Sequence, residues 1–166
     1  RGGKVMAILD NIRNVMNKVI RIICIVLFAF MVIIGTYQIL VRYIFNSPST
    51  VSEELLTYSF TWMSLFAAAY VSGKREHMRM GFLADKLSGK NLTILNVVID
   101  IITIAFALIV MVYGGISITS LSMTQKTASL GIPMGYIYIV IPITGIVIAV
   151  YGILNVTDLI RKGENV

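Results

Sequence analysis

The side chains best placed to do chemistry are Arg42, Glu53 and Glu54, which flank a polar link at residues 46–52 between two long apolar runs. Charged groups at this spacing could cap a helix, form an ion pair or bind another protein. Thr50 and Glu53 fit a capping box, in which each side chain accepts a hydrogen bond from the other's backbone N–H. Glu54 lies outside that motif. It could pair with Arg42 across the link, or either residue could face a partner, and the sequence leaves both alternatives open.

Two other ionisable residues need an interpretation. Asp100 is the one acid well inside an apolar run, and a carboxylate within a membrane is a functional candidate by default. It lies close enough to one end of its run to snorkel or pair with a nearby cation, so a structural role is slightly favoured. His77 is the only histidine and lies in a basic stretch without other metal ligands. With no P-loop, HExxH motif or nucleophile beside a base, the sequence predicts no enzyme, metal site or cofactor.

The composition is that of an integral membrane protein. Hydrophobic residues make up 57% of the 166 residues and charged residues only 13%, against roughly a quarter charged in soluble domains. The mean hydropathy is +0.87. The net charge is +6, and a basic excess in a membrane protein is typical of cytoplasmic loops. The lysines and arginines are divided among several loops, which argues against nucleic-acid binding. The single cysteine, Cys24, excludes a disulfide framework and redox chemistry that needs thiol pairs.

The uncharged runs predict an all-α membrane protein with four transmembrane helices in one domain over residues 1–166. The first run lies between Arg21 and Arg42. At ~1.5 Å per residue it is long enough to cross ~30 Å of hydrocarbon. Pro142 is expected to kink the last span or free a carbonyl. The predicted spans cover residues 19–45, 53–73, 91–122 and 133–158.

Two amphipathic segments accompany these spans. Residues 4–20 alternate apolar and polar side chains at helical spacing and predict an N-terminal extension of the first span, lying near phospholipid headgroups. Residues 76–89 are too short and too charged to cross a membrane, and predict a short interfacial helix between spans two and three. The candidates for contact with lipid headgroups are Lys18, Arg21, Arg75, His77, Arg79 and Lys86.

The distribution of lysine and arginine predicts the orientation. Twelve of the 14 lie in the N-terminal segment, the link between spans two and three, and the C-terminal tail. Only Arg42 and Lys126 lie on the other side. Both termini are therefore expected to be cytoplasmic. The link at 46–52 and the loop at 124–133 then face the exterior.

The second span carries a stripe of small or polar side chains, which is typical of a close helix–helix contact. The neighbouring helix could belong to this chain or to another protein. The middles of spans one, two and four carry no charge, whereas coupled carriers usually keep ionisable groups there. The chain is therefore predicted to be a helper that packs on another membrane protein. The stripe comprises Thr57, Thr61, Ser64 and Ala68, with Tyr58 and Trp62 beside it.

Several short motifs, each weak alone, occur in a familiar order. With the number, spacing and orientation of the spans, they make nearly the whole chain resemble the small membrane subunit of tripartite ATP-independent periplasmic (TRAP) transporters. The overall likeness is nearest to the small subunits of sialic-acid systems. One departure is Val51, where members of the family often carry Trp. The motifs are Arg42-Tyr-x-Phe45-Asn-x-Pro48, Glu53-Glu54-Leu55, Trp62, Gly73-Lys-Arg-Glu-His77-Met-Arg-Met and Leu130-Gly-Ile-Pro133-Met-Gly-Tyr136.

The resemblance implies a role in the bacterial inner membrane. A periplasmic binding protein would capture an organic acid, such as sialic acid or a C4-dicarboxylate, and a large permease would carry it with sodium by an elevator motion. This chain would be the scaffold subunit that packs on the permease and offers surface to the binding protein, with sodium bound by the partner. The alternatives are a self-sufficient homo-oligomeric transporter or channel, and a membrane enzyme or redox protein. The candidate partner contacts are Arg42, Glu54, Tyr58, Thr61, Trp62, Asp100, Lys126, Pro133 and Tyr136.

Overall fold

The computed structural model describes the backbone of residues 2–74 and 90–163, and the side chains of residues 7–74 and 94–159. These residues form helices and short connections, which confirms the predicted all-α class. The predicted interfacial helix at 76–89, with Arg75, His77, Arg79 and Lys86, lies outside the described residues. The elements in chain order are α1 (Gly2–Ile44), α2 (Thr50–Lys74), α4 (Lys90–Phe106), the π-helix η1 (Ala107–Gly114), α5 (Gly115–Leu121), the 3-10 turn η2 (Ser122–Thr124), α6 (Gly135–Tyr138) and α7 (Val140–Gly163).

Among the described residues, three stretches are long and apolar enough to cross a membrane: Ala7–Ile44, Ile94–Thr124 and Gly135–Leu159. The helix α2 is not one of the three, because its hydroxyl and aromatic side chains dilute its apolar character. The count of four spans therefore stays a prediction. The expected N-terminal extension and first span are one continuous helix of 43 residues, which is ~65 Å long and about twice the thickness of a hydrocarbon core.

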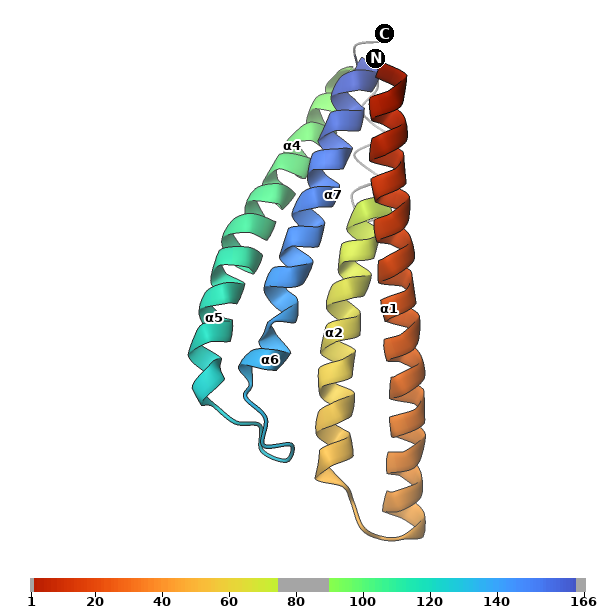
Figure 1. Cartoon of the computed structure of the whole chain (residues 1–166), viewed down its shortest axis with the longest axis vertical. Helices are drawn as coiled ribbons and strands as arrows, with labels where there is room; N and C mark the ends of the chain where they lie inside the picture. The colour runs from red at the N-terminus through yellow and green to blue at the C-terminus, as the bar shows by residue number, and fades with distance from the viewer. Residues whose placement is uncertain (1, 75–89, 164–166) are drawn as a thin grey trace.

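The long helices lie side by side in one layer, in the order α4, α7, α2 and α1 (Figure 1). The helix α7 is central. In the membrane-length apolar stretch that contains it, 56% of the apolar segment is buried, against 6% for the stretch in α1 and 11% for the stretch from α4 to α5. Such an arrangement leaves broad apolar faces on the outer helices. Exposed apolar area on this scale marks contact with lipid or another protein.

The stretch from α4 to α5 packs closely on α7 through glycines of α7. A Cβ added at Gly145 would lie 2.7 Å from the Cβ of Met111 and 3.2 Å from the carbonyl oxygen of Ala107, both in η1. A Cβ at Gly152 would meet the side chain of Ile104. These two glycines therefore mark a close contact between α7 and the stretch from α4 to η1. Only Gly places the backbones of α7 and η1 this near each other.

The last predicted span is interrupted at Ile139, between α6 and α7. Pro142 follows three residues later, and its missing N–H cannot bond the carbonyl of Tyr138 in the preceding turn. The adjacent carbonyl of Ile137 accepts a hydrogen bond from the indole N–H of Trp62 at 3.0 Å. Pro142 was expected to kink this span or free a carbonyl, and the structure shows an interruption three residues before it, where α2 supplies a donor.

Replacing Gly145 with Ala is expected to lower the stability of the full chain by about 1 kcal/mol, because one methyl group overpacks the contact between α7 and η1. The expected fall in the thermal unfolding midpoint is about 2–4 °C, measured on the purified chain in detergent. Gly114→Ala is the control, since its added Cβ would come no closer than 3.9 Å to the atoms outside its own turn. Equal falls for the two variants would contradict the close contact at Gly145.

Candidate partner-binding surface

Glu54 holds the loop of residues 125–134, which joins η2 to α6. Its Oε1 accepts a hydrogen bond from the backbone N–H of Ser129 at 3.1 Å, and its Oε2 accepts one from the N–H of Leu130 at 3.0 Å. Charge-assisted bonds of this kind are stronger than neutral ones. One carboxylate at the start of α2 therefore fixes a loop that is distant in sequence.

The loop has its own regular structure. Residues Lys126 and Pro133 form an antiparallel bridge, the N–H of Thr127 donates to the Ile132 carbonyl at 2.9 Å, and the N–H of Met134 donates to the Gln125 carbonyl at 2.8 Å. Gly131 turns the chain with a φ of +67°, a conformation that glycine adopts without strain. The loop is thus a small hairpin, and Glu54 binds its turn.

The predicted capping box is wrong by one residue. The helix α2 begins at Thr50, and the residue before it, Ser49, is the N-cap. The hydroxyl of Ser49 accepts a bond from the N–H of Ser52 at 3.4 Å, while the Ser52 hydroxyl donates to the Ser49 carbonyl at 3.0 Å. Serine caps a helix as well as threonine does, so Glu53 has no capping role and its side chain is exposed.

The alternative of an internal Arg42–Glu54 ion pair is also wrong. Both oxygens of Glu54 bind the loop, and Arg42 is exposed at the end of α1 without a hydrogen bond or ion pair to any described residue. Lys126 and Tyr136 are exposed near the same end of the layer, and Pro133 is half-buried. Whether these four residues contact a partner stays a prediction.

Tyr58 and Trp62 are used within the chain. The Tyr58 hydroxyl donates to the Met134 sulfur at 3.8 Å. The Trp62 indole bonds the Ile137 carbonyl and meets the ring of Phe66 edge-on, with 6.4 Å between ring centres. Together with Glu54, these residues form a line along α2 that holds the loop and α6.

The predicted stripe of small residues on α2 faces away from the other helices. Thr57, Thr61, Ser64 and Ala68 are all exposed. The hydroxyls of Thr57 and Thr61 donate to the carbonyls four residues earlier, at 2.9 Å and 3.0 Å, so the stripe presents few unmet polar groups. The described part of this chain supplies no helix to cover it.

A polar cluster at the other end of the layer was not foreseen from the sequence. Arg13 of α1 donates to Asp158 of α7 at 2.7 Å and to Asn155 at 3.1 Å, and the Tyr151 hydroxyl donates to Asn17 at 2.7 Å. Residues 4–20 were predicted to lie near headgroups, which stays a prediction, and their Arg13 and Asn17 bind side chains of α7. The sequence carried part of this signal, because Tyr151, Asn155 and Asp158 share one face of a helix and Arg13 and Asn17 share another. It did not show that these two faces lie against each other.

Asp100 of α4 is 2% exposed and has an interaction partner. Its burial argues against direct contact with a second protein, and its candidate role as a partner contact stays a prediction. Among the described residues there is no group of three or more metal-ligating side chains.

The fold and the surface define a class: a helical membrane protein whose outer faces suit packing against lipid and other proteins. The family model described as "Tripartite ATP-independent periplasmic transporters, DctQ component" matches residues 31–162. The chain belongs to this family, and it is a transporter subunit and not an enzyme.

Three curated relatives carry matching names. Two proteins of Haemophilus influenzae, each named "Putative TRAP transporter small permease protein", are 24% identical to this chain; one match covers 93% of this chain and 97% of the relative, the other 87% of each. The "Sialic acid TRAP transporter small permease protein SiaQ" of Vibrio cholerae is 28% identical, over 83% of this chain and 79% of the relative.

Proposed function

We propose that this chain is the small scaffold subunit of a sodium-coupled TRAP transporter that imports an organic acid, with sialic acid as the first candidate substrate and a C4-dicarboxylate as the second. It packs on a large elevator-type permease and enlarges the part of the complex that stays still during transport. Family membership supports the transporter class. The name of the Vibrio cholerae relative supports sialic acid.

The exposed stripe on α2 is the observation that carries the proposal. Small side chains let a second helix approach closely. The threonine hydroxyls already bond to carbonyls of their own helix, so covering them leaves no hydroxyl without a hydrogen bond. The chain leaves this face uncovered within its described residues. A helix of the permease is the proposed neighbour.

The end of the layer that carries the Glu54-bound loop is proposed to face the periplasm and to help dock the binding protein. The exposed Arg42, Lys126 and Tyr136 offer polar and aromatic groups there. This orientation places both termini in the cytoplasm, with four spans in the inner membrane. Sodium and substrate bind the permease.

Co-expression with the large permease of the same transporter tests the proposal. The tagged chain is expected to co-purify with the permease, and substrate uptake into vesicles is expected to need both subunits and the binding protein. Ala68→Trp, in the stripe, should reduce co-purification about tenfold, which corresponds to ~1.4 kcal/mol. Ile109→Trp on η1, which is 66% exposed at the far side of the layer, is the control. Equal losses would contradict an interface at the stripe.

The competing function is a self-sufficient homo-oligomeric transporter or channel. Reconstituting this chain alone into vesicles separates the two. The scaffold proposal expects no substrate uptake from the isolated chain, and saturable uptake would overturn it.

A further inference from the structure

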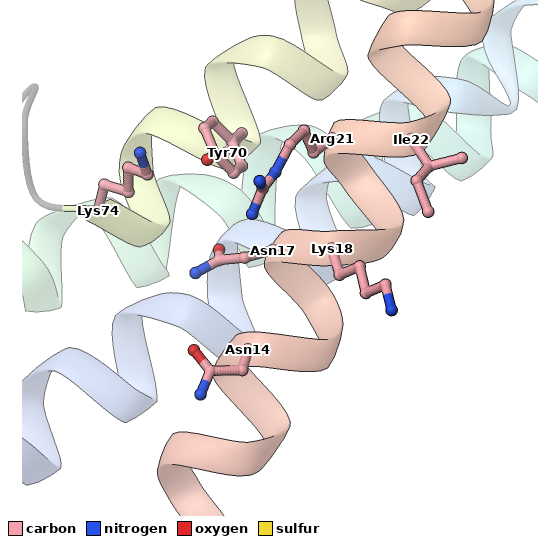
Figure 2. Close-up of a pocket in the computed structure, with 7 residues that line it drawn as sticks. All are labelled: Asn14, Asn17, Lys18, Arg21, Ile22, Tyr70 and Lys74. Carbon is pink, nitrogen blue, oxygen red and sulfur yellow. The ribbon is translucent and has the colours of Figure 1, made fainter.

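A polar cavity of about 600 Å³ opens between the N-terminal half of α1 and the C-terminal end of α2. The described residues that line it include three cations and no acid. Figure 2 shows Asn14, Asn17 and Arg21 extending from α1 to the side on which Tyr70 and Lys74 of α2 lie, whereas the ammonium of Lys18 points away from them. Amide, ammonium and guanidinium donors arranged in this way suit an anion.

A second, apolar cavity of about 370 Å³ continues from the first. The two share Arg21 and Tyr70 as lining residues. From there the second cavity follows the same pair of helices and is lined by Cys24, Phe28 and Met63, among other apolar residues. Residues 21 to 28 of α1 span ~10 Å along the helix axis. A charged recess thus leads into an apolar groove.

The position of the two cavities along the helices matches a membrane boundary. The uncharged run of α1 starts directly after Arg21, and that of α2 ends directly before Lys74. The cations therefore lie where both apolar runs stop, at the level expected for lipid headgroups, and the groove lies at the level of the hydrocarbon.

Contacts with α7 and within α2 hold the walls of the polar cavity in place. The side-chain oxygen of Asn17 accepts the hydrogen bond from Tyr151 at 2.7 Å, and the ring of Tyr151 packs against Gly73. The ammonium of Lys74 lies 4.8 Å from the centre of the Tyr70 ring. The recess is therefore preformed, which lowers the entropic cost of binding.

We propose that the two cavities form one site for an anionic glycerophospholipid. Its phosphate lies among Arg21, Lys74 and the side-chain amides, and one acyl chain lies in the groove beside Cys24 and Phe28. A free phosphate would use only the polar recess, whereas the continuity of recess and groove fits a lipid. The proposal depends on this chain alone and stands or falls apart from its assembly with a permease.

Binding of three ligands to the purified, delipidated full chain tests the site. These are phosphatidylglycerol, phosphatidylcholine with the same acyl chains, and glycerol 3-phosphate. Native mass spectrometry measures the binding of each. Phosphatidylglycerol is expected to bind about tenfold or more tightly than phosphatidylcholine, because the choline ammonium of the latter offsets the negative charge that Arg21 and Lys74 attract. Because Cys24 is the only cysteine, its alkylation by N-ethylmaleimide reports on the groove. Bound phosphatidylglycerol should slow this alkylation, and glycerol 3-phosphate should not.

Variants add a second measurement. Replacing both Arg21 and Lys74 with Gln should weaken phosphatidylglycerol binding about 10–30-fold. Arg42→Gln is the control, since it removes a cation from the exposed far end of α1. Equal binding of the two phospholipids, slowing of alkylation by glycerol 3-phosphate, or phosphatidylglycerol binding that leaves Cys24 fully reactive would each overturn the proposal. The comparison of ligands on the unaltered chain stands even if the double variant fails to fold.

Discussion

Replacing Glu54 with Gln is expected to free the turn of the 125–134 loop, so that the amides of Ser129 and Leu130 exchange with solvent about 30-fold faster. The carboxylate accepts one bond from each amide. A glutamine keeps one acceptor oxygen and turns its NH2 group toward the second N–H, so one bond is lost. Hydrogen bonds to charged groups contribute about 1.5–3 kcal/mol. A loss of about 2 kcal/mol corresponds to the expected change in exchange rate.

Glu53→Gln is the matched control for this experiment. It makes the same change in charge one residue earlier, on a side chain that is exposed, and should leave both amides protected. Hydrogen–deuterium exchange of the full chain, followed at the loop peptides, measures the difference. Unchanged protection in Glu54→Gln would show that the loop is held by its own hairpin bonds alone. The charge swap of Glu54→Arg with Arg42→Glu is expected to restore nothing, because the two side chains do not pair.

The helices of this chain follow from local sequence patterns, and the contacts between them do not. Uncharged runs sufficed to predict an all-α fold, and Pro142 marked the interruption at Ile139. These features depend on residues close together in the chain. The sequence predicted Thr50 as the N-cap, whereas the structure has Ser49. The two could not be told apart because both residue types are good caps and a helix start can shift by one residue.

The sequence did not show which groups the individual charged side chains bind. Glu54 binds backbone N–H groups, which every residue but proline carries, so no side-chain pattern identifies Ser129 and Leu130 as its partners. Arg13 looked like one cation among several on a basic face. Its turn toward Asp158 depends on α7 lying beside the N-terminal half of α1, a neighbour that only the tertiary structure reveals.

Replacing Arg13 with Gln is expected to destabilise the full chain by about 3 kcal/mol, because it leaves Asp158 and Asn155 without their shared donor. Breaking a buried ion pair from one side costs about 3–5 kcal/mol. The lower end applies because the side chains of Arg13 and Asp158 are 25% and 22% exposed, so water partly screens the charge left behind. For a chain of this size the unfolding midpoint should fall by about 6–12 °C.

A double-mutant cycle separates the ion pair from other effects of Arg13. Arg13→Asp and Asp158→Arg should each destabilise the chain, and the combination should recover about half of the loss, with a coupling of about 1–2 kcal/mol that falls at high salt. Asp10→Asn is the control for removing an acid from an exposed position on α1. Additive losses in the cycle would mean that Arg13 acts through Asn155 and packing, and not through Asp158. Because Arg13 and Asn17 fix the same turn of α1 against α7, loss of the pair should also widen the polar cavity and weaken phosphatidylglycerol binding.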